Sequence, residues 1–123
     1  MTPRAVRALI ALGGLASLVH FADNATSMSR YPEPSWITPA GVWISWIPVG
    51  ALCIYLVLKK RSDRSFQVGA VVFGVVLMAG LLHFAFGSMA MLMSPISMTT
   101  VFAEAACGVA LLIALWRTPR VRS

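Results

Sequence analysis

Charged residues are scarce in this sequence. Asp, Glu, Lys and Arg make up 11% of its 123 residues, whereas roughly a quarter of the residues in a soluble domain are charged. With this little charge and a mean hydropathy of +0.81, the chain is too apolar for a soluble globular protein. We therefore expect an integral membrane protein whose main partner is the lipid bilayer.

Cysteine is also rare. Cys53 and Cys107 both fall inside apolar segments, and no C-x-x-C pair is present. Isolated cysteines inside apolar segments usually serve as small packing residues, and a disulfide is not expected so deep in a membrane segment. The cysteine pattern therefore excludes both a disulfide-stapled domain and a cysteine-rich metal site.

Long polar segments are missing as well. Four apolar segments take up most of residues 1–123, namely 5–22, 40–58, 66–86 and 99–116. Each is close to the ~20 residues that a helix needs to cross a hydrocarbon core about 30 Å thick. We predict an all-α fold in which a single integral membrane domain forms a polytopic four-helix bundle.

The basic residues give the chain a formal net charge of +6, but their positions indicate membrane orientation and not a nucleic-acid partner. Nine of the ten lie near the start of the first segment, between the second and third, or after the fourth: Arg4, Arg7, Lys59, Lys60, Arg61, Arg64, Arg117, Arg120 and Arg122. Only Arg30 falls in one of the other two loops. Lys and Arg mark cytoplasmic loops. We therefore predict that both termini are cytoplasmic and that the membrane is an inner (plasma) membrane of bacterial type.

A short motif occurs twice in the chain. Residues 15–22 (LASLVHFA) align with residues 78–85 (MAGLLHFA), and each copy is followed by Ser-Met, a proline and a second apolar segment. We interpret this internal repeat as two tandem helix hairpins. Because an even number of spans separates them, the two repeats are parallel and are related by an axis along the membrane normal. His20 and His83 then occupy equivalent positions.

The first segment has a polar face. Gly13, Ser17, His20 and Asn24 follow one another at steps of four, three and four, which is the spacing of one helical face. Small residues on such a face let a neighbouring helix approach closely. His20 is therefore predicted to point into the bundle, with Asp23 and Asn24 beyond it at the water boundary.

Glu104 is the acidic residue of the fourth segment. An ionisable side chain at that depth costs roughly 2.5 to 3.5 kcal/mol on insertion scales, so it is expected to have a partner. At a rise of about 1.5 Å per residue, Glu104 falls at nearly the same depth as His20 and His83. We predict that these three side chains form one polar site in the extracytoplasmic leaflet, with Asp23 and Asn24 at its mouth.

Several functions are compatible with such a site. The site could bind or move a small ligand, a cation or a proton, as buried carboxylates and histidines do in transporters. Alternatively, His20, His83 and Glu104 could hold a metal, or the two histidines could be axial ligands of a haem in a redox protein or enzyme. A third possibility is a non-catalytic accessory subunit. The sequence does not identify a cofactor, a substrate or a reaction.

Two loops carry further candidates. Arg30, Tyr31, Glu33 and Trp36 could form a lid over the site, although an interfacial anchor with a solvated ion pair is the simpler interpretation. The methionines of the run Met89-Met91-Met93 are soft ligands that suit copper(I), although methionine also fills gaps in apolar segments. Because four helices make a thin wall for a transport path, we also expect a homodimer or a membrane partner subunit.

Overall fold

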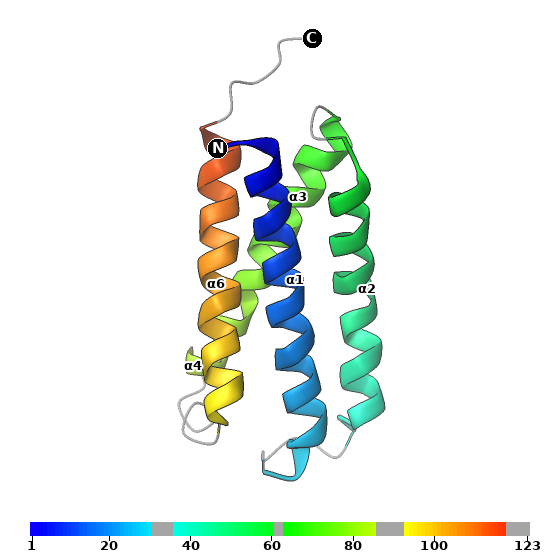
Figure 1. Ribbon diagram of the computed structural model, residues 1–123. Helices are drawn as coiled ribbons and strands as arrows, with labels where there is room; N and C mark the ends of the chain where they lie inside the picture. Colours follow the sequence, from blue (N-terminus) through cyan, green and yellow to red (C-terminus); the bar gives the residue numbers. More distant parts are fainter. Residues whose placement is uncertain (31–35, 61–62, 86–92, 118–123) are drawn as a thin grey trace.

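The computed structural model describes residues 1–30, 36–60, 63–85 and 93–117. Over these ranges the chain is helical and contains no strand, and four of its helices are long and apolar enough to cross a membrane (Figure 1). The predicted all-α membrane bundle of four apolar helices is thereby confirmed. The repeat and the cytoplasmic location of the termini stay predictions.

The four spans are formed by five α-helices. α1 covers Pro3–Thr26, α2 covers Pro39–Leu58 and α6 covers Pro95–Trp116. In the third span, α3 (Arg64–Met78) continues through the 3-10 turn Ala79–Leu81 into the short helix α4 (Leu82–Ala85). A further 3-10 turn, Met28–Arg30, follows α1.

Three of these helices begin with the same local signal. A threonine or serine caps the helix by accepting a hydrogen bond from the backbone N–H three residues on, and a proline takes the first helical position: Thr2-Pro3, Thr38-Pro39 and Ser94-Pro95. The cap satisfies a backbone donor that has no partner inside the helix, and proline lacks the donor altogether. α6 therefore begins at residue 95 and not at the predicted 99, which brings Ser94 and Ser97 into the site described below.

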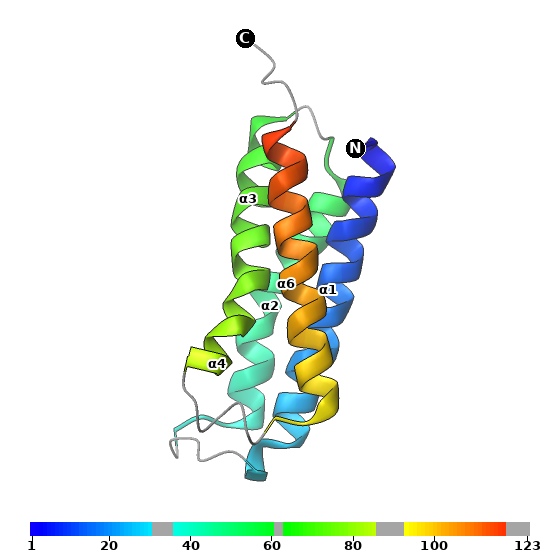
Figure 2. The same ribbon diagram turned by 90° about the vertical axis from the view of Figure 1, so that its left-hand side faces the viewer.

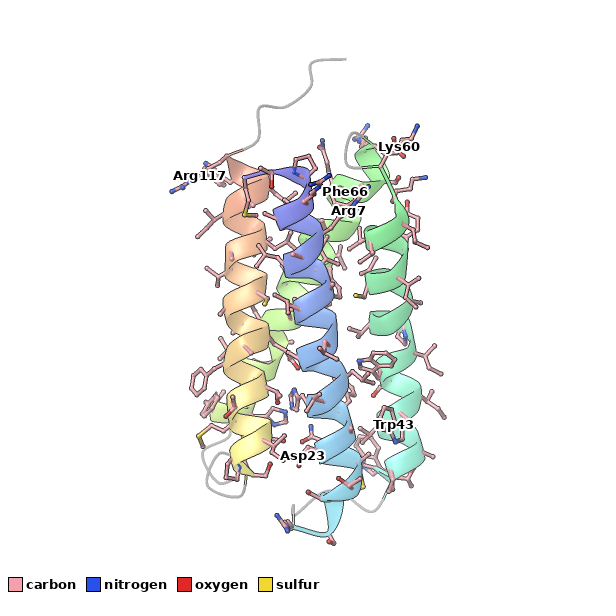
Figure 3. The ribbon with its side chains drawn as sticks, viewed as in Figure 1. Arg7, Asp23, Trp43, Lys60, Phe66 and Arg117 are labelled. Atoms are coloured by element: carbon pink, nitrogen blue, oxygen red, sulfur yellow. The ribbon has the colours of Figure 1, made fainter. Side chains whose placement is uncertain are left out.

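The helices pack as antiparallel neighbours (Figures 1 and 2). α1 and α3 each pack against both α2 and α6, so α6 closes the ring of helices. Figure 3 shows Arg7, Lys60 and Arg117 at one end of the bundle and Asp23 at the other. Basic residues from three separate parts of the chain thus gather at one end, which we call the basic end.

An apolar core fills the half of the bundle near the basic end. Its buried side chains come from all four spans: Val6, Ile10, Leu56, Phe66, Ala70, Phe73, Leu77, Leu111 and Ala114. At the level of Phe73 and Leu77, α3 and α6 touch through their backbones, since a Cβ atom built on Gly108 would lie 2.5 Å from the carbonyl oxygen of Gly74. The polar side chains occupy the other half, toward Asp23.

The third span differs locally from the predicted continuous helix over 66–86, whose last residue lies outside the described ranges. The 3-10 turn Ala79–Leu81 interrupts it, and α4 turns away from the axis of α3 (Figures 1 and 2). The turn contains Gly80, and glycine is the poorest helix former after proline. On α4, Phe84 stacks on Phe102 of α6, with ring centroids 5.3 Å apart. The aligned residues of α1 are regular α-helix, so the two copies of the motif differ in backbone here.

Candidate functional site

The centre of the site is a buried pair formed by His20 and Glu104. Nδ1 of His20, on α1, lies 3.0 Å from Oε1 of Glu104, on α6, and the two side chains are only 3% and 4% exposed. When Glu104 is ionised, the His20 tautomer with its proton on Nδ1 donates to the carboxylate across this contact. Glu104 was expected to have a partner because an ionisable side chain inside a membrane is costly. That partner is His20, and their hydrogen bond links α1 to α6.

His83 lies directly against this pair. Its ring centroid is 5.3 Å from that of His20, and the planes meet at 64°, which is an edge-to-face contact. His83 comes from α4 and is half-buried, whereas His20 is inside the bundle. The structure thus brings the two histidines of the repeated motif together, in one layer with Glu104.

The second carboxylate oxygen of Glu104 packs on the backbone of the third span. A Cβ atom built on Gly80 would lie 3.2 Å from Oε2 of Glu104 and 3.4 Å from both methyl groups of Val101. A glycine in the 3-10 turn lets the chain approach the carboxylate this closely. Nothing in the sequence indicates that the residue on which Gly80 packs is Glu104.

The other ring nitrogen of His20 has no such contact. Nε2 is buried, and within the described part of the chain it has no hydrogen-bond partner. Most buried polar atoms in proteins are hydrogen-bonded, so an unpaired one calls for an explanation such as a catalytic role, a bound water or an ion. Trp46 Nε1 on α2 is also buried and unpaired over the same residues, but its ring packs over Gly50.

A second polar layer lies about one helical turn from His20, toward the end of the bundle. Oδ2 of Asp23 accepts hydrogen bonds from the hydroxyls of Ser94, at 2.5 Å, and Ser97, at 2.6 Å. The Ser97 hydroxyl is also 3.2 Å from Oδ1 of Asn24. Asp23 and Asn24 therefore form a hydrogen-bonded network with the start of α6.

The two serines were missed by the sequence reasoning, although a signal for them exists. Ser94 precedes Pro95, a combination typical of a helix start, and Ser97 follows one turn later on the same face. A helix predicted from residue 95 would have placed both beside Asp23 in an antiparallel packing of α1 and α6.

Replacement of Ser97 by alanine is expected to lower the free energy of unfolding by about 2 kcal/mol, because the buried hydroxyl donates to a carboxylate. Thr99→Ala is the matched control. It removes a hydroxyl from the same helix, but this one is exposed and donates to the carbonyl of Pro95, so a change within about 0.5 kcal/mol is expected. Reversible unfolding in mixed micelles with increasing SDS measures both. Equal effects would show that the Asp23 network does not hold α1 to α6.

The lid and copper hypotheses fall largely on residues outside the described ranges. Tyr31, Glu33, Met89 and Met91 are among those residues. Of the others, Arg30 is exposed at the end of its 3-10 turn, Trp36 is 77% exposed, and Met93 is half-buried. Both hypotheses stay predictions.

The metal and haem alternatives gain no support from the geometry. Across residues 1–30, 36–60, 63–85 and 93–117, no three His, Cys, Asp or Glu side chains are arranged to hold a metal ion. The rings of His20 and His83 touch each other, so a haem would fit between them only after the two helices separated. Both alternatives stay predictions that this arrangement does not favour.

Comparisons with protein-family models, with curated proteins and with solved structures find no match for this chain. Its function is therefore inferred from the fold and the site. These define a small protein of four membrane-compatible helices that holds a buried His–Glu pair with a second histidine against it.

Proposed function

We propose that this protein is an integral membrane protein that binds and releases a proton at His20 and Glu104. The observation that carries the proposal is the 3.0 Å contact between Nδ1 and Oε1 of two side chains that are both almost fully buried. Ionisable residues inside a membrane are costly and are functional by default. Histidine exchanges protons near neutral pH more readily than any other side chain.

A proton suits this site better than a larger ligand does. His20 and Glu104 are in direct contact, and Gly80 and Val101 pack against the far side of the carboxylate. An organic molecule or a hydrated cation would have to separate helices to reach Oε1 or Oε2. A proton needs no such volume, and either partner of the pair can carry it.

A purely structural role explains fewer of the contacts. A buried ion pair is weak support for stability, because well-packed apolar side chains of similar volume often replace one without loss. A structural pair also gives no reason for a second titratable ring in contact with His20 or for an unpaired Nε2. Both are expected where a proton moves.

We further propose that the basic end faces the cytoplasm of a cell with a bacterial-type plasma membrane and that the Asp23 end is extracytoplasmic. The positive-inside rule supports this orientation, because Arg7, Lys60 and Arg117 lie together at that end (Figure 3). Proton exchange would then take place with the extracytoplasmic side. A homodimer or a partner subunit stays part of the proposal.

Proton uptake by the purified protein tests this function. Between about pH 5 and pH 8, where a histidine site titrates, Glu104→Gln and His20→Gln are each expected to lower the uptake by about one proton per chain. Asp63→Asn is the matched control, since this half-exposed carboxylate pairs with Lys59 at 3.4 Å on the surface. Titration curves of both site variants that superimpose on wild type would overturn the proposal and favour an accessory, structural protein. If the site variants do lower the uptake, vesicles that contain the protein and a pH-sensitive dye, placed under a pH gradient, would show whether the bound proton also crosses the membrane.

A further inference from the structure

We propose that His83 delivers the proton to His20, so that His83, His20 and Glu104 act in that order as a relay. This inference rests on the proposed function and adds the route by which the buried pair reaches water. Its starting point is Nε2 of His20, which is buried and unpaired among the described residues. The opposite nitrogen of the same ring is bonded to Glu104.

The geometry makes His83 the donor to Nε2. His20 is 3% exposed and cannot exchange a proton with water directly, whereas His83 is half-buried and touches the His20 ring edge-to-face. Nε2 of His20 has no direct hydrogen bond to His83, but ring centroids 5.3 Å apart put the two imidazoles within reach of transfer through one water. His83 thus links the interior of the bundle to its periphery.

Other titratable groups near His20 fit the role less well. On α1, Asp23 accepts two serine hydroxyls through Oδ2. On α6, Glu104 is the acceptor of the relay and Cys107 lies one turn beyond it. α2 carries Cys53 and Tyr55, but these contact the carbonyl of Ile10 and the hydroxyl of Ser65, toward the basic end.

The transfer balances without a further reactant. Protonated His83 gives up a ring N–H proton to a bridging water, which passes one of its own protons to Nε2 of His20, and the Nδ1–H bond of His20 breaks as its proton passes to Oε1 of Glu104. His83 and His20 end neutral, His20 now with its proton on Nε2, and Glu104 ends as a neutral acid that donates back to Nδ1. The reverse sequence releases the proton. His20 therefore changes tautomer with each transfer.

The chain contains two histidines, which makes the tautomer change directly measurable. With isotope-labelled histidine in lipid bilayers, NMR shifts of Nδ1 and Nε2 show which nitrogen of each ring carries a proton, and the rate of exchange with water can be followed for each ring. His83→Phe keeps an aromatic ring against His20 but removes both nitrogens. His83→Gln removes the ring and is the second variant. Phe84→Leu is the control, because Phe84 is on the same short helix but stacks on Phe102.

Both His83 variants are expected to slow proton exchange at His20 by about 100-fold, the lower end of what a positioned proton-transfer group contributes. The Nδ1 signal of the bond to Glu104 should stay as in wild type, and Phe84→Leu should exchange at the wild-type rate. Unchanged exchange in both His83 variants, with the His20–Glu104 pair still taking up protons, would overturn the relay but leave the proposed function standing. Slowing in Asp23→Asn instead would assign the route to Asp23. A His20–Glu104 pair that takes up no proton in wild type would overturn both proposals.

Discussion

Replacement of His20 by leucine is expected to lower the free energy of unfolding by about 3 to 5 kcal/mol at neutral pH, because it leaves a buried carboxylate without its partner. The leucine restores most of the lost volume, so the effect comes mainly from Glu104 and not from a cavity. Acid should reduce the loss, since a protonated carboxyl has no charge to compensate. Reversible unfolding in mixed micelles with increasing SDS, at neutral and acid pH, measures both effects.

The double variant His20→Leu/Glu104→Leu tests whether the stability lost in His20→Leu comes from the broken contact with Glu104. Two apolar side chains of similar size leave no buried charge, so the double variant is expected to recover most of the stability that the single variant loses. The cycle completed by Glu104→Leu should give a coupling energy between the two residues of about 3 kcal/mol, the upper end for side chains in contact. Strictly additive losses would mean that His20 and Glu104 do not interact in the folded protein. A stable double variant that takes up no proton would separate function from folding.

Much of the site could be predicted from depth alone. Helix rise fixes the level of each residue once the ends of the spans are known, and this was enough to put His20, His83 and Glu104 in one layer. Depth does not give the rotation of each helix about its axis. The choice of His20 as the partner of Glu104, with His83 against the ring, depends on how α1 and α6 pack, and no periodicity in a single segment contains that information.

The local backbone of the third span was not predictable from the repeat. Residues 15–22 and 78–85 are closely similar, yet the first stretch is regular helix and the second contains a 3-10 turn. The difference at Ser17 and Gly80 is one of the few sequence differences between them, and Gly80 packs on a carboxylate that belongs to a distant helix. The start of α6, in contrast, was available from Ser94-Pro95, because capping is a local interaction.

The same tight contacts between helices hold the site and limit its size. α6 carries Glu104 and, one turn further, Gly108, whose missing side chain lets α6 lie against the backbone of α3. α3 leads into the turn that brings Gly80 onto Glu104 and His83 onto His20. The spacing of α3 and α6 therefore sets how closely His83 approaches the pair, whereas the pair itself depends on α1 and α6.

Gly108→Ala tests whether the spacing of α3 and α6 affects His83 separately from the His20–Glu104 pair. The variant is expected to lower the free energy of unfolding by about 3 kcal/mol, the upper end for an overpacked site. The new Cβ would lie 2.5 Å from the carbonyl oxygen of Gly74, and a backbone cannot move aside as a side chain can. Gly69→Ala is the matched control on α3. Its Cβ would meet the end of the flexible Leu56 side chain at 3.2 Å, and alanine favours helix by up to about 1 kcal/mol over glycine, so little change is expected. Unfolding in mixed micelles measures both variants.

The same variant also separates the relay from the pair. Since α6 and α1 stay in contact through His20 and Glu104, proton uptake by Gly108→Ala is expected to match that of wild type. A wider gap between α3 and α6 should move His83 away from His20 and slow proton exchange at His20, in the direction expected for His83→Phe and by a smaller factor. A Gly108→Ala variant that loses proton uptake but keeps the wild-type rate of proton exchange at His20 would contradict this expectation. It would mean that α3, through Gly80, holds the Glu104 carboxylate in place.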